Sequence, residues 1–189
     1  ISTMRRVAAI DATEEAVGRA TELGTPVLNC FGEYEIHDSG EGPSMMASIS
    51  VASYVARLCA RNGVRHIAVS PVATPVPVLL DVVRQAYEAE GTLEAFKTDD
   101  VRYIQGQLTY GAFVGQIMEI EKPAVCFCIG PFMAAAAYIA EIPKRYNAFV
   151  VAGSNRSFVL PFFAVSSDYL MIGEEQFAAS AYVEKDPIK

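Results

Sequence analysis

The chain has 189 residues, of which 52% are hydrophobic and 20% are charged, and its formal net charge is −7 at pH 7. This length fits one domain with a buried core, and the acidic balance argues against a surface for nucleic acid or anionic lipid, both of which need clustered basic residues. Because an average soluble domain has about 25% charged residues, either the chain belongs in a membrane or another protein covers part of its apolar surface.

The longest stretch without a charged residue covers residues 123–140. A membrane-spanning helix needs about 20 consecutive apolar residues, and Gly130-Pro131 interrupts this stretch. We interpret it as a buried strand, a turn and a helix of small residues. Oligomerisation is therefore our preferred explanation for the low charge, since obligate interfaces resemble a domain core, and we expect a homo-oligomer in the cytoplasm.

The N-terminal residues 1–10 are predicted to be an extension of a single domain that covers residues 1–189. The chain begins at Ile1 and not at a methionine, and it shows no signal-peptide pattern. The extension follows either a missing segment or a processing site.

The first predicted elements are a helix, a strand and a loop. Asp11 is predicted to cap the helix, because Glu14 stands three residues later, and Gly24 is predicted to end it. Residues 25–31 then form a core strand, and residues 32–43 form a polar, acidic loop.

The next predicted helix runs from a cap at Ser44 to about Asn62, and it has hardly any polar face before Arg57. A helix that is apolar nearly all round is buried on more than one side. We therefore expect it either in an interface between chains or deep between layers. The residues that we assign to an interface are Met45, Met46 and Ile49.

The rest of the chain alternates between strands and helices of ten or more residues. Further strands are predicted at residues 64–70, 101–105, 125–129, 148–152 and 162–166. Further helices are predicted after residues 71–77, ending at Gly91, and at residues 109–121, 132–142 and 173–182. Several strands are continuous apolar runs, which is typical of parallel sheets buried on both faces. The order predicts an α/β domain with a three-layer Rossmann-like fold, in which helices cover both faces of a mostly parallel sheet of about six strands.

The candidate ligand site follows from the strand ends, because ligands of open α/β sheets bind beyond the carboxyl ends of the strands. We select Gly130, which follows the fourth predicted strand, and the run that follows the fifth, Gly153, Ser154, Asn155, Arg156 and Ser157. Small residues and hydroxyls beside an arginine could hold a phosphate or carboxylate. The alternative is a polar turn whose side chains satisfy their own backbone. Other polar residues at strand ends are Glu33, Ser70, Thr74, Gln105 and Thr109.

Signatures of catalysis and of cofactor binding are absent from the sequence. No GxGxxG motif follows the first strand, and the chain contains neither a P-loop nor a GxSxG motif. His37 and His66 are the only histidines, and neither stands at a telling spacing from a nucleophile. Glu174-Glu175 fits the first turn of a helix better than a paired-carboxylate site. We therefore expect no cofactor and assign no catalytic residue.

The four cysteines are interpreted as small buried hydrophobic residues in a reducing compartment. They are Cys30, Cys59, Cys126 and Cys128. They form no CxxC pair and have no histidine at ligand spacing. Cys126 and Cys128 share one face of a strand, which makes a bridge between them difficult, and we expect no metal.

Four stretches together resemble an uncharacterised prokaryotic family of domains of unknown function. The stretches are residues 44–61, 86–91, 151–155 and 160–182. The most specific part is Gly173-Glu174-Glu175 with its Ala-Ser-Ala-Tyr continuation, and the resemblance covers about Ala12 to Pro187. It implies an α/β domain joined to membrane-spanning segments and working at the inner face of a membrane. This chain departs from the pattern by showing no span of its own, and the resemblance supplies no catalytic residue.

Two hypotheses for the function follow. The first is a non-catalytic, self-associating domain, which acts as scaffold or subunit of a larger assembly with a membrane protein or anchor outside this chain. The second is a Rossmann-like enzyme or binding protein for a small anionic ligand, held by Gly130 and the run 153–157. The missing catalytic signatures favour the first.

Overall fold

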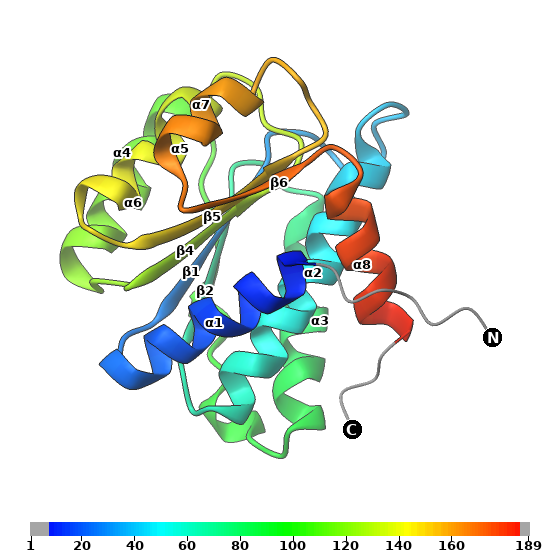
Figure 1. Cartoon of the computed structure of the whole chain (residues 1–189). Coiled ribbons are helices and arrows are strands. Elements are labelled where there is room, and N and C mark those ends of the chain that lie inside the picture. The colour runs from blue at the N-terminus through cyan, green and yellow to red at the C-terminus, as the bar shows by residue number, and fades with distance from the viewer. Residues whose placement is uncertain (1–7, 186–189) are drawn as a thin grey trace.

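The computed structural model describes residues 8–185, and within this range six strands form one sheet (Figure 1). The strands are β1 (Val27–Phe31), β2 (His66–Ser70), β3 (Val101–Tyr103), β4 (Val125–Ile129), β5 (Phe149–Ser154) and β6 (Tyr169–Ile172). All neighbours are parallel, and the spatial order is β3-β2-β1-β4-β5-β6. This is the order of a doubly wound Rossmann-type sheet, with its switch point between β1 and β4.

Helices cover both faces of this sheet and complete three layers (Figure 1). One face carries α1 (Ala8–Leu23), α2 (Gly42–Arg61), α3 (Pro75–Ala89) and α8 (Glu175–Lys185). The other face carries α4 (Gln107–Ile120), α5 (Ala136–Ile139), α6 (Glu141–Arg145) and α7 (Leu160–Ser166). Two short 3-10 turns, η1 (Leu93–Ala95) and η2 (Thr98–Asp100), precede β3. The predicted three-layer α/β fold is confirmed.

The alternation of side chains along β4 shows how the sheet divides the core. Cys126 and Cys128 face α4 and α5, whereas Val125, Phe127 and Ile129 face α1 and α2. Because both faces are covered, every residue of β1, β2 and β4 is buried. This is the physical reason why these strands are mostly apolar, with Asn29 in β1 and His66 and Ser70 in β2 as buried polar exceptions.

Helix α2 lies deep between layers, in contact with α1, α3 and α8 and with the sheet. Met45 and Ile49 are 0% and 3% exposed and pack on Phe31 and Leu79 within this chain. They therefore have no side-chain surface for a second chain, and their assignment to an interface is corrected. Met46 is 43% exposed and remains the one interface residue of the three that a partner could reach.

The predicted strand at residues 162–166 is wrong, since these residues belong to helix α7. Pro161 stands in the first turn of this helix, where its missing N–H costs nothing. Phe163 is fully buried, whereas Phe162 and Val165 are 48% and 86% exposed, as expected for a helix with one face on the sheet. The sixth strand comes directly afterwards and pairs with β5.

Two predicted helix caps are also corrected. The first helix already contains Ala8, so Asp11 lies in its first turn, where the helix dipole favours a carboxylate. Helix α2 begins at Gly42 after Glu41, so Ser44 lies inside the helix and is not its cap. In both cases a polar residue in the first turn resembled a cap in the sequence.

Two other predictions concern the chain ends and a helix break. Residues 8–10 of the predicted extension are helical, and residues 1–7 lie outside the described range. The predicted helix at residues 132–142 is divided into α5 and α6.

Over the part of the chain that the structure describes, no helix combines the length and apolar character that a membrane span requires.

Candidate functional site

The candidate site lies at the carboxyl edge of the sheet, where the loops after β1 and β4 meet. Gly32 packs so closely on the second loop that an added Cβ would lie 2.5 Å from the carbonyl oxygen of Pro131. Gly130 has a φ of 147°, and a Cβ there would lie 2.9 Å from the amide nitrogen of Gly32. The amide of Glu33 donates to the Pro131 carbonyl at 3.0 Å. The two backbones are therefore in direct contact at the switch point, where doubly wound sheets bind ligands.

Three residues of the predicted run after β5 do not form an open cradle. Gly153 lies within the sheet, where an added Cβ would be 3.0 Å from the Cβ of Met171, and its carbonyl accepts the amide of Gly130. Ser154 is fully buried, and its hydroxyl accepts the amide of Arg156 at 3.3 Å. Ser157 is exposed. The polar-turn alternative therefore describes this run in part, with Ser154 as the residue that satisfies the turn.

Asn155 and Arg156 reach across the carboxyl edge to the residue before α2. Nη1 of Arg156 donates to Oε1 of Glu41 at 2.9 Å and to the hydroxyl of Tyr34. Nδ2 of Asn155 donates to Oε2 of the same carboxylate at 2.9 Å. The guanidinium also lies over the rings of Tyr34 and Phe158. Both oxygens of the Glu41 carboxylate thus occupy the groups that were predicted to hold a ligand anion.

A buried polar network continues from Asn155 toward α8. The hydroxyl of Ser44 donates to Oδ1 of Asn155 at 3.0 Å. Nε2 of Gln176 donates to the carbonyl of Ser44 and to the hydroxyl of Ser48, both at 2.8 Å. Gln176 is fully buried, and its Oε1 has no hydrogen-bond partner in the described part of the chain. The network joins α2, α8 and the loop after β5.

Two further carboxylates of the acidic loop bind the amide ends of helices. Oε2 of Glu33 accepts the amides of Met133 at 2.6 Å and of Ala135 at 3.0 Å, directly before α5. Glu35 accepts the amide of Thr74 at 3.2 Å, directly before α3. Helix N-termini are natural anion sites because their free amides and the helix dipole favour negative charge. Glu33, Glu35 and Glu41 therefore fill three anion-binding positions at this edge with the chain's own charge.

The family of the chain follows from comparison with known proteins. Residues 2–189 match the family described as "Domain of unknown function (DUF6754)". The chain belongs to this family. The resemblance to a family of domains of unknown function is thereby confirmed, while membrane-spanning partners of this DUF6754 domain are a matter for proposal.

Other comparisons add little about this DUF6754 domain. A search of curated protein sequences finds no significant match. Among solved structures, glucose-6-phosphate 1-dehydrogenase from Mycobacterium avium is similar with a TM-score of 0.40 and 17% sequence identity. The similarity covers 78% of this chain and 36% of that enzyme's chain, so this chain spans about a third of it. Likeness at this level carries no functional argument.

The histidines of the DUF6754 domain stand at opposite edges of the sheet. His37 is an exposed residue of the acidic loop, whereas His66 is the first residue of β2 and is buried. The two histidines therefore cannot act together. The contacts of Asn155 and Arg156 at the carboxyl edge are made with carboxylate and hydroxyl groups. The contacts of the carboxyl edge thus hold charged side chains in fixed positions. None of the described contacts there pairs a nucleophile with a histidine base.

Sequence reasoning noted Glu33 as a strand-end residue but missed Tyr34, Glu41 and Gln176. One local signal could have found Glu41, because it directly precedes Gly42-Pro43 and a proline marks the first turn of a helix. No local signal points to Gln176, whose partner Ser44 lies 132 residues away in the chain.

Proposed function

We propose that this domain is a non-catalytic, self-associating scaffold or subunit of a larger assembly next to a membrane. The observation that carries the proposal is the filling of the ligand-binding edge by Glu33, Glu35 and Glu41. Displacing Glu33 and Glu41 would leave the amide of Ala135 and the guanidinium of Arg156 without their partners, which is costly because both contacts are partly buried. This edge therefore favours a structural role over turnover of a substrate.

The surface for self-association is proposed to be the α7 surface, which we define as Phe158, Phe162 and Val165. Their exposed fractions are 51%, 48% and 86%. Phe162 and Val165 stand three residues apart and so lie on the same side of the helix. Large exposed apolar patches mark interaction sites, and we propose that these three residues contribute to one. The neighbouring strand β6 ends the sheet of the described residues, and an end strand offers unpaired backbone groups to a partner.

Absolute mass in solution tests this proposal, measured by light scattering behind a sizing column over a wide concentration range. We expect a discrete oligomer for the wild type and single chains for Val165→Lys. A lysine is suitable because Val165 lies in the last turn of α7, where a cation agrees with the helix dipole.

The matched control is Leu23→Lys, which places the same charge on a 60% exposed residue at the end of α1, on the other face of the sheet. This variant should keep the mass of the wild type. A wild type that stays a single chain at every concentration would overturn the proposal.

The location next to a membrane is supported by the resemblance of residues 44–61 and 160–182 to a membrane-joined family. Cell fractionation with the native protein tests it. Recovery in the membrane fraction, through a partner or anchor, supports the location, and recovery in the soluble fraction alone contradicts it.

A second function, the binding of a small anion, is favoured by the convergence of Arg156 and Asn155 on one carboxylate. An anionic ligand would replace Glu41 there, so Glu41→Gln should bind it more tightly and Arg156→Ala should lose it. A thermal-shift screen with nucleotides, sugar phosphates and carboxylic acids tests this. At about 100 times the Kd we expect a stabilisation of roughly 5 °C or more. The control is Arg84→Ala on the outer side of α3, and a screen without any stabilising compound would exclude this function.

A further inference from the structure

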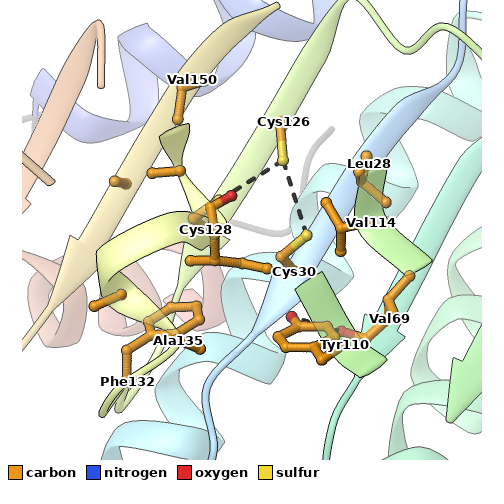
Figure 2. Packing of buried hydrophobic residues seen from close by; sticks show 14 of the residues in the cluster. Leu28, Cys30, Val69, Tyr110, Val114, Cys126, Cys128, Phe132, Ala135 and Val150 are labelled. Atoms are coloured by element: carbon orange, nitrogen blue, oxygen red, sulfur yellow. Dashed lines mark hydrogen bonds between the residues drawn. The ribbon is translucent and has the colours of Figure 1, made fainter. Parts of the chain in front are cut away.

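Three of the four cysteines come together in the core between the sheet and α4. Figure 2 shows the three side chains close together, with dashed lines from Cys126 for its contacts with Cys30 and Cys128. The Sγ of Cys126 lies 3.9 Å from that of Cys30 and 3.7 Å from that of Cys128, and all three sulfurs lie within 4.8 Å of one another. The side chains are 0% exposed. The parallel pairing of β1 with β4, which sets Cys30 beside Cys128, brings the first thiol to the other two.

The two separations from Cys126 match the spacing of sulfurs around one metal ion. With metal–sulfur bonds of about 2.3 Å, the sulfurs of a tetrahedral or trigonal thiolate site lie about 3.8 to 4.0 Å apart. A disulfide needs a sulfur–sulfur distance of only about 2.0 Å. The two distances from Cys126 therefore agree with metal binding, whereas a disulfide bridge would require the sulfurs to move much closer together.

The ligand set selects the class of metal. Within the described residues no histidine or carboxylate joins the three thiols. Soft thiolate ligands alone favour thiophilic ions, above all Cu(I) and Zn²⁺. Structural Zn²⁺ sites almost always have four ligands, whereas Cu(I) is stable with three sulfurs. The coordination number thus places Cu(I) ahead of Zn²⁺.

We propose that Cys30, Cys126 and Cys128 form a buried three-sulfur site for one thiophilic metal ion, with Cu(I) preferred over Zn²⁺. The ion replaces thiol protons and ties β1 to β4 at the switch point of the sheet. This proposal does not depend on self-association or on anion binding.

Metal binding requires these thiols to lose their protons. Burial raises the pKa of Cys126 well above its usual value. Burial also acts to raise the pKa of Cys30, but hydrogen bonding by the neighbouring thiols lowers it. Since metal binding releases protons, the affinity should increase with pH.

The experiment measures the metal bound by the reduced protein after anaerobic overnight incubation with Cu(I) as its bicinchoninate complex or with Zn²⁺. Native mass spectrometry should show one ion per chain, and Cu(I) should displace Zn²⁺. Cd²⁺ should produce the ultraviolet charge-transfer band of thiolate ligands. Substitution Cys126→Ser removes the central sulfur and should abolish both signals.

The fourth cysteine provides the matched control. Cys59 is equally buried but lies on α2, in the cluster on the opposite face of the sheet, so Cys59→Ser should bind metal like the wild type. Wild-type protein that binds neither ion would overturn the proposal without any need for a variant. Metal binding that depends on Cys59 and not on Cys126 would also overturn it.

Discussion

His66 is a buried ionisable residue whose protonation opposes the fold. It is 2% exposed, and neither ring nitrogen has a hydrogen-bond partner in the described range. Burial lowers the pKa of His66 from its usual 6.5 to about 4, against a smaller opposing effect of Asp100. The unfolded chain therefore binds a proton more readily than the folded chain between these two pH values. It follows that stability decreases as the pH decreases through this window.

We predict that the free energy of unfolding decreases by about 3 kcal/mol between pH 7 and pH 4 because of His66 alone. Urea unfolding over a series of pH values measures this change. The variant His66→Leu should have a flatter profile above about pH 5, where most carboxylates are still ionised. The control His37→Gln removes an exposed histidine and should leave the profile unchanged. Equal slopes for His66→Leu and the wild type would contradict the prediction.

At the scale of elements, the acidic loop between β1 and α2 holds the start of α5. This helix has four residues, and so short a helix is not stable by itself. Glu33 accepts two of the amides before it. The other oxygen of Glu33 is buried without a partner in the described structure, and this cost offsets part of what the carboxylate contributes.

We predict that Glu33→Ala lowers the free energy of unfolding by about 1 kcal/mol, the low end of the cost of leaving buried donors unsatisfied. Chemical denaturation measures the loss. Hydrogen exchange should become faster at the amides of residues 133–140 and stay unchanged in β2. Glu94→Ala is the control, since Glu94 is an exposed residue of η1. A variant with wild-type stability and exchange would show that α5 does not depend on the loop.

At the scale of the whole molecule, the low content of charge agrees with how much of the chain is buried. Much of it is explained within the chain, because the sheet is covered on both faces and α2 packs against three other helices. Burial inside one chain therefore explains part of the low charge content, for which composition alone suggested an oligomer. The surface that we propose for a partner is the α7 surface, with Val165 86% exposed. The mass measurement with Val165→Lys decides how much of the apolar excess belongs to assembly.

The sequence by itself determined the type of most helices and strands and the α/β class of the fold. Strand runs such as residues 125–129 and helices such as residues 109–121 were predicted correctly in type, because each pattern depends on neighbours along the chain. The run at residues 162–166 was assigned wrongly, since a short apolar segment fits a strand as well as a helix that is buried on one side.

Only the tertiary structure decided which side chains meet. Arg156 finds Glu41 across 115 residues, and Cys30 finds Cys126 across 96 residues. The cysteine pair depends on the placement of β4 beside β1, and the Arg156 pair depends also on the placement of β5 beside β4. Strand order is set by the packing of helices on both faces of the sheet, and local periodicity contains no information about it. The sequence could therefore place Arg156 at a strand end, but not show that a carboxylate of the same chain already binds it.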